Sequence, residues 1–216
     1  MNQKTKKITF IAMLCALSYV TMMVMRIPVV LFLKYEAKDV FITMGGFIFG
    51  PLTSVIISLV VSLVEMITVS ETGVIGCIMN ILSTCSFAGV AALVYKKKHN
   101  MWGAVTGLIL GTLFTTAVML LWNYLITPLY MEMPREQIAG LLIPAFLPFN
   151  LIKGTLNTAI ILLIYKPVVS ALRRSRLIPA SSSERDGRNN YIAITIIAAV
   201  VLATCVLTIM ALNGML

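Results

Sequence analysis

Hydrophobic residues form seven runs along this chain, separated by shorter polar segments. The runs cover residues 8–25, 40–49, 52–69, 74–95, 101–126, 144–172 and 191–212. All but the second are close to or above the roughly 20 residues that an α-helix needs to cross a bilayer. The pattern therefore predicts an all-α fold, a polytopic membrane helix bundle with a six-helix core and an appended seventh transmembrane helix.

The second run is too short for an ordinary crossing. Its ten residues give roughly 15 Å of helix, against a hydrocarbon core of about 30 Å. The charged stretch 34–39, Lys-Tyr-Glu-Ala-Lys-Asp, comes directly before it. If this run crosses, we expect that stretch to reach down into the outer half of the bundle.

Composition agrees with a membrane protein, since 59% of the 216 residues are hydrophobic and only 12% are charged. Soluble domains are about 45–50% apolar and about 25% charged. The net charge of +9 does not indicate nucleic-acid binding, because the cations gather at the ends of apolar runs. The first run lacks a small-residue cleavage pattern, so we expect it to remain as an anchor.

The distribution of lysine and arginine predicts the orientation. With the second run counted as a crossing, twelve cations lie on one side and four on the other, and the richer side is expected to be cytoplasmic. The twelve are Lys4, Lys6, Lys7, Lys96, Lys97, Lys98, Lys166, Arg173, Arg174, Arg176, Arg185 and Arg188; the four are Arg26, Lys34, Lys38 and Arg135. This predicts a multi-pass plasma-membrane protein with a cytoplasmic N-terminus and an extracellular C-terminus.

The same pattern divides the chain into three parts. Residues 1–174 form the predicted six-helix membrane domain, residues 175–190 a hydrophilic linker, and residues 191–216 the additional transmembrane helix. A second long outer segment, residues 127–143, is expected to be a loop that forms a lid together with the first one.

Lys153 is the cation that remains inside an apolar run. It lies nine residues beyond Pro144, roughly 14 Å into the helix, where a lysine costs about 2.5–3.5 kcal/mol and needs a partner or a function. Asn150 and Asn157 share its helix face at spacings of three and four residues. We expect this face to point inward.

Further polar residues fall at a similar depth: Glu65, Asn80 and Asn123. When each helix is measured from its outer end, all lie in the outer half of the membrane. A pocket that opens outward would need this distribution. The alternative is a hydrogen-bond network that only holds the bundle together.

Nothing in the sequence supports catalysis or metal binding. His99 is the single histidine, and the HExxH, GxSxG and GxxxxGK[ST] motifs do not occur. The four cysteines lie in apolar runs without paired spacing, so neither disulfides nor zinc is indicated. We therefore expect no enzyme, no resident cofactor and no ATP hydrolysis by this chain itself.

Two helices carry small residues at four-residue spacing, which permits close helix approach. Gly103, Gly107 and Gly111 suggest packing inside the bundle, whereas Ala12 and Ala16 repeat on the first helix.

Several motifs together resemble the riboflavin-specific S-components of energy-coupling factor transporters. The segment 32–39, Phe-Leu-Lys-Tyr-Glu-Ala-Lys-Asp, followed by Gly45-Gly46-Phe47 and Gly50-Pro51, resembles the first loop and second helix of that family. The segment 148–154, Pro-Phe-Asn-Leu-Ile-Lys-Gly, resembles its sixth helix, and Trp122-Asn123-Tyr124 the end of its fifth. The resemblance covers roughly residues 5–172; the seventh helix departs from it.

The resemblance implies a membrane-embedded subunit that captures riboflavin from outside. It implies Asn123, Asn150 and Lys153 as ligands, with Asn80 and Asn157 as further candidates, and places Leu33 and Tyr35 in the lid. It also implies docking of a transmembrane coupling subunit at Ala12 and Ala16, with two cytoplasmic ATPase subunits completing the importer. The alternatives are another small vitamin or FMN as cargo, or a non-transporting scaffold subunit of a membrane complex.

Overall fold

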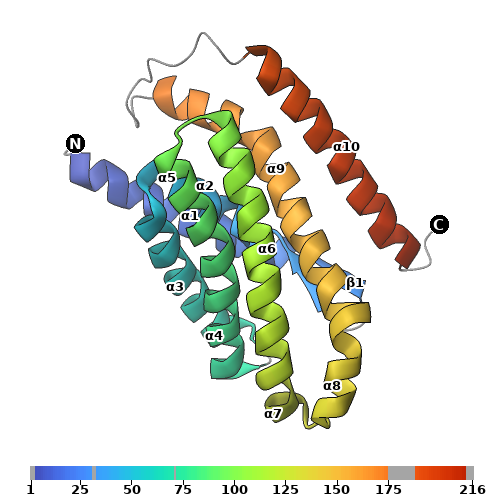
Figure 1. Cartoon of the computed structure of the whole chain (residues 1–216). Helices are drawn as coiled ribbons and strands as arrows, with labels where there is room; N and C mark the ends of the chain where they lie inside the picture. Colours follow the sequence, from blue (N-terminus) through green and yellow to red (C-terminus); the bar gives the residue numbers. More distant parts are fainter. Residues whose placement is uncertain (1–2, 31–32, 71, 175–187, 213–216) are drawn as a thin grey trace.

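The computed structural model describes residues 3–30, 33–70, 72–174 and 188–212, and these are mostly helical (Figure 1). The elements are α1 Gln3–Val24, β1 Arg26–Val30, β2 Leu33–Glu36, α2 Lys38–Phe49, α3 Pro51–Thr68, α4 Gly73–Thr84, η1 Cys85–Gly89, α5 Val90–Lys97, α6 Met101–Leu125, α7 Thr127–Met131, α8 Arg135–Leu141, η2 Leu142–Phe146, α9 Leu147–Arg174 and α10 Arg188–Leu212. The predicted linker falls largely on 175–187, outside the described residues.

Six helical stretches within the described residues are long and apolar enough to cross a bilayer. They cover Lys4–Val24, Pro51–Thr68, Gly73–Lys97, Met101–Leu125, Arg135–Ser170 and Tyr191–Ala211. Two contain a wider π-helical turn, η1 between α4 and α5 and η2 between α8 and α9. The predicted all-α membrane bundle is confirmed.

The second outer segment is not the loop that the sequence suggested. Residues 127–143 contain α7 and α8, and α8 continues through η2 into α9, so this helix begins at Arg135, nine residues before Pro144. Pro134 occupies the N-cap of α8, and the wider turn η2 accommodates Pro144, which has no backbone N–H to donate.

The short helix α2 is the central element of the bundle, and α1, α3, α5 and α9 pack around it. Nine of its twelve residues are buried. Its length is about 18 Å at 1.5 Å per residue, so it fills only part of the membrane thickness. The space beyond its N-terminal end is closed by the strands β1 and β2.

Strands β1 and β2 form an antiparallel hairpin that the sequence analysis did not predict. Arg26 lies opposite Glu36 and Ile27 opposite Tyr35, with an irregularity between Pro28 and Val30. The charged stretch that follows leads straight into α2, and Tyr35, Lys38 and Asp39 are buried. The expectation that this stretch reaches into the bundle is confirmed.

The glycines of α6 allow it to pack closely on the neighbouring helix. A methyl group at Gly107 would lie 2.7 Å from the carbonyl oxygen of Ala91, and one at Gly111 would lie 2.7 Å from that of Phe87. The predicted role of these glycines in internal packing is confirmed.

Helix α10 packs along α9 at the edge of the bundle, and its C-terminal end reaches β1 (Figure 1). Ile194, Ala198 and Ile209 are its buried contacts with the rest of the chain. Lys166 of α9 lies 4.0 Å from the ring centre of Tyr191 at the start of α10. The appended helix is thus held against the core.

Candidate functional site

A cavity of about 370 Å³ lies between the hairpin and the adjacent ends of α3, α4, α6 and α9. This volume is in the range of sites for small molecules. Its lining residues are Arg26, Leu33, Lys34, Glu36, Glu65, Val69, Ser70, Thr72, Met79, Asn80, Ser83, Met119, Asn123, Tyr130, Met131, Phe146, Phe149, Asn150 and Lys153. Apolar and aromatic walls with several amides and charges can hold a flat, partly polar molecule.

Lys153 is placed in this cavity by its pairing with Asp39. The Lys153 ammonium lies 3.4 Å from the Asp39 carboxylate. The same carboxylate accepts hydrogen bonds from the Thr84 hydroxyl at 2.7 Å and from the Asn157 amide at 3.4 Å. Asp39 is only 1% exposed, so the lysine compensates a carboxylate that water does not reach.

Asn157 and Tyr35 lie behind the cavity wall rather than in the lining. The Tyr35 hydroxyl donates to the Asn157 side-chain oxygen at 2.8 Å, and both residues are fully buried. Burial, reinforced by the nearby Asp39 carboxylate, raises the pKa of the Tyr35 phenol above its ordinary value. The phenol therefore stays neutral and acts as a donor that ties the hairpin to α9.

Four charged side chains, Arg26, Glu36, Lys38 and Glu65, join the hairpin to α3; we call them the hairpin charge cluster. Lys38 lies 2.6 Å from Glu65 and 3.0 Å from Glu36. Arg26 lies 3.1 Å from Glu36 and 3.7 Å from Glu65. With two cations and two carboxylates, the cluster is neutral, as burial requires.

Three of the four predicted asparagines, Asn80, Asn123 and Asn150, line the cavity. Asn123 donates to the carbonyl oxygen of Met119 and accepts from the Thr127 hydroxyl. Asn150 donates one amide hydrogen to the carbonyl oxygen of Phe146. An amide has two hydrogens and an oxygen, so each of these side chains keeps capacity for a ligand.

Sequence reasoning did not select Asp39, Arg26, Glu36 or Lys38 as site residues. A signal was present, because the charged stretch 34–39 directly precedes an apolar helix. Glu65 is among the predicted polar residues in the membrane, but its partners are Lys38 at the start of α2 and Arg26 of the hairpin, which was not predicted. Leu33 does line the cavity.

Ala12 and Ala16 lie on α1, outside the cavity, and both are exposed. They leave a narrow strip on α1 that no described element of this chain covers. The pair is free to contact another helix closely.

The family profile "ECF transporter, substrate-specific component" matches residues 6–165 of this chain. The chain is 31% identical to the riboflavin transporter RibU of Staphylococcus aureus (strain TCH60), over 80% of this chain and 95% of that protein. It is 29% identical to the riboflavin transporter FmnP of Bacillus subtilis (strain 168), over 81% of this chain and 99% of that protein.

A solved structure of the S component of a bacterial ECF transporter shares the fold. It superimposes with a TM-score of 0.68 and 28% sequence identity, covering 79% of this chain and 99% of the other. The profile match ends at residue 165, before α10 begins.

Proposed function

The chain belongs to the substrate-specific components of ECF transporters, and on this basis we propose that it binds riboflavin in the hairpin-covered cavity. Such components are transport subunits rather than enzymes, and they are multi-pass membrane proteins. The observation that carries the proposal is the lining itself, in which aromatic and methionine side chains lie beside Asn123, Asn150 and Lys153.

The chemistry of riboflavin suits this lining. The isoalloxazine ring is flat, with apolar faces and an edge of carbonyl oxygens and ring nitrogens. We infer that Phe146, Phe149 and Met79 contact the faces. The amides and the Lys153 ammonium have the donors and acceptors for the polar edge. Asn80 is a further candidate for the ribityl hydroxyls, whereas Asn157 and Tyr35 act indirectly by holding Asp39 and the hairpin.

Charge balance favours riboflavin over FMN. Arg26, Lys38 and Lys153 each lie within 4 Å of a carboxylate, so their charges are already compensated. The carboxylates of Glu36 and Glu65 in the lining would therefore repel the phosphate of FMN. Lys34, which also lines the cavity, is exposed to solvent. A neutral ribityl chain avoids this repulsion.

Titration of the purified chain with riboflavin tests the proposal. We expect stoichiometric quenching of riboflavin fluorescence at submicromolar concentrations. FMN should compete at least tenfold more weakly than unlabelled riboflavin, and thiamine should not compete. A scaffold subunit would bind no ligand, and a carrier of another vitamin would prefer the competitor. Quenching absent at micromolar riboflavin, or displacement by thiamine, would overturn the proposal.

We further infer that this subunit works as part of an ATP-driven importer. A transmembrane coupling subunit would dock on α1 at Ala12 and Ala16, and two cytoplasmic ATPase subunits would supply the energy. Both alanines are exposed on one face of α1. Ala12→Trp is expected to leave riboflavin binding intact and to abolish uptake by cells that express the whole transporter.

The domain division and the orientation can be tested together. We infer that residues 1–174 bind riboflavin without α10, because every cavity-lining residue lies between Arg26 and Lys153. From the cation distribution we infer that the N-terminus and Arg174 lie in the cytoplasm and that the cavity opens to the outside.

A chain that ends at Arg174 and carries a C-terminal green fluorescent protein should therefore fluoresce in cells and bind riboflavin within about threefold of the full chain. The same fusion after Leu216 should stay dark, because that fluorescent protein does not fold after export. Loss of binding in the shorter chain would refute the domain division. A bright fusion after Leu216 would refute the orientation.

A further inference from the structure

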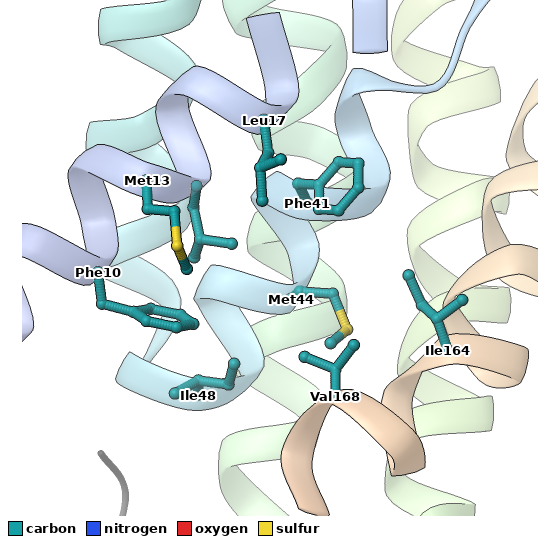
Figure 2. Close-up of a pocket in the computed structure, with 9 residues that line it drawn as sticks. Phe10, Met13, Leu17, Phe41, Met44, Ile48, Ile164 and Val168 are labelled. Atoms are coloured by element: carbon teal, nitrogen blue, oxygen red, sulfur yellow. The ribbon is translucent and has the colours of Figure 1, made fainter. Parts of the chain in front are cut away.

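A second cavity, separate from the vitamin site, lies between α1, α2 and α9. It has a volume of about 190 Å³. Figure 2 shows side chains from all three helices directed into it, including Phe10, Met13 and Leu17 of α1, Met44 of α2, and Ile164 of α9. Every lining side chain is apolar, and we call this space the α1–α2–α9 groove.

The groove lies towards the end of the bundle where the chain begins. Its α1 residues start at Phe10, its α2 residues reach Ile48 near the C-terminal end of that helix, and its α9 residues reach Val168. The vitamin cavity instead lies beyond the N-terminal end of α2. The two sites share no lining residue, so one can be altered without the other.

Two lysines precede the groove residues on α1. Lys6 precedes Phe10, Met13 and Leu17 by four, seven and eleven residues, which places it on the same face of α1. Lys6 is half-buried. The Lys7 ammonium lies 5.6 Å from the ring centre of Phe49, and that ring packs at 5.5 Å on Phe10, a wall of the groove.

Among the described residues, no acidic side chain lies within ion-pair distance of these two lysines. α1 contains no aspartate or glutamate, and neither Lys6 nor Lys7 takes part in any ion pair among the described residues. Side chains on a helix lean towards its N-terminus. The ammonium groups are thus directed away from the hydrocarbon and towards the polar surface of the membrane.

The lining of the groove indicates what can fill it. A hydrocarbon chain matches the wholly apolar lining. A basic pocket between transmembrane helices is a recognised site for anionic lipid headgroups.

We propose that the α1–α2–α9 groove binds one acyl chain of an anionic phospholipid, with Lys6 and Lys7 contacting its phosphate and headgroup. Each lysine near the membrane surface strengthens anionic lipid binding about fivefold. The lipid would fill the groove without occupying the vitamin cavity.

Native mass spectrometry of the full chain, released from micelles with added dioleoyl phosphatidylglycerol or dioleoyl phosphatidylcholine, tests this proposal. We expect one phosphatidylglycerol to remain bound at concentrations where phosphatidylcholine does not. Lys6→Gln with Lys7→Gln should weaken it about 25-fold. Leu17→Trp, which fills the groove, should weaken both lipids by at least fivefold.

Matched controls separate this site from general charge and size effects. Lys96→Gln with Lys97→Gln removes two exposed cations elsewhere, and Ala12→Trp adds bulk to another face of α1; both should change lipid affinity less than twofold. Equal retention of the two lipids, or equal effects of the two lysine pairs, would overturn the proposal. An unchanged affinity in Leu17→Trp would overturn it as well. Riboflavin titration of every variant shows that each is folded and tests the vitamin site independently.

Discussion

Replacing Lys153 with methionine should weaken riboflavin binding about 100-fold. Methionine preserves much of the side-chain volume but removes the ammonium that lines the cavity and lies 3.4 Å from Asp39. A hydrogen bond from a charged donor contributes about 1.5–3 kcal/mol, and each 1.4 kcal/mol is tenfold in affinity. Fluorescence titration measures the change directly.

Lys166→Met is the matched control for Lys153→Met, because it removes an exposed lysine from the same helix. It should bind riboflavin with unchanged affinity. The Asp39 carboxylate keeps its hydrogen bonds from Thr84 and Asn157 in the Lys153 variant, so that variant should still fold, with a Tm lowered by the loss of the ion pair. If Lys153→Met bound riboflavin within threefold of the unaltered chain, the assigned role of this lysine would be wrong.

Lys38→Met should cause a large loss of stability. The Lys38 side chain is 1% exposed and pairs with Glu65 at 2.6 Å and Glu36 at 3.0 Å. Its removal leaves the two carboxylates with Arg26 as their remaining partner in the cluster. Breaking a buried ion pair in this way costs about 3–5 kcal/mol, which corresponds to a fall in Tm of roughly 10 °C for a chain of this size.

Two further variants make the test of the hairpin charge cluster specific. Lys34→Met removes an exposed lysine from the same hairpin and should shift Tm by no more than about 1–2 °C, as surface substitutions do. The double variant Lys38→Met with Glu65→Met replaces the pair by apolar groups and should recover most of the loss. Equal Tm values for Lys38→Met and Lys34→Met would contradict the structural role of the cluster.

The sequence predicted the parts of the fold that depend on local pattern. Long apolar runs identified the membrane helices, including α10, and the spacing of Asn150, Lys153 and Asn157 identified the inward face of α9. The charged stretch before α2 also showed that something polar enters the bundle. These features follow from hydropathy and helical periodicity alone.

The details of the site depend on contacts between distant residues, which periodicity does not encode. Asn157 shares a face with Lys153, yet Tyr35, 122 residues away, occupies its side-chain oxygen and removes it from the cavity lining. The sequence pattern placed Asp39 in a loop, but it lies in the first turn of α2 and pairs with Lys153. The hairpin was not predicted because its strands are only five and four residues long and the first of them, β1, contains Pro28.

The outer segment 127–143 illustrates a different limit. Its prolines and charges are typical of a loop, but Pro134 caps a helix and Pro144 lies in the wider turn η2. The cavity is therefore bordered by the hairpin on one side and by α7 and η2 on the other, since Tyr130 and Phe146 are among its lining residues.

Mass spectrometry of the small molecule that copurifies with the chain tests the central claim most directly. Protein from cells supplied with riboflavin should be yellow and should release riboflavin in a ratio close to one per chain, and Lys153→Met should release far less. A different compound released at that ratio, or equal riboflavin from Lys153→Met and the unaltered chain, would contradict a riboflavin site built around Lys153.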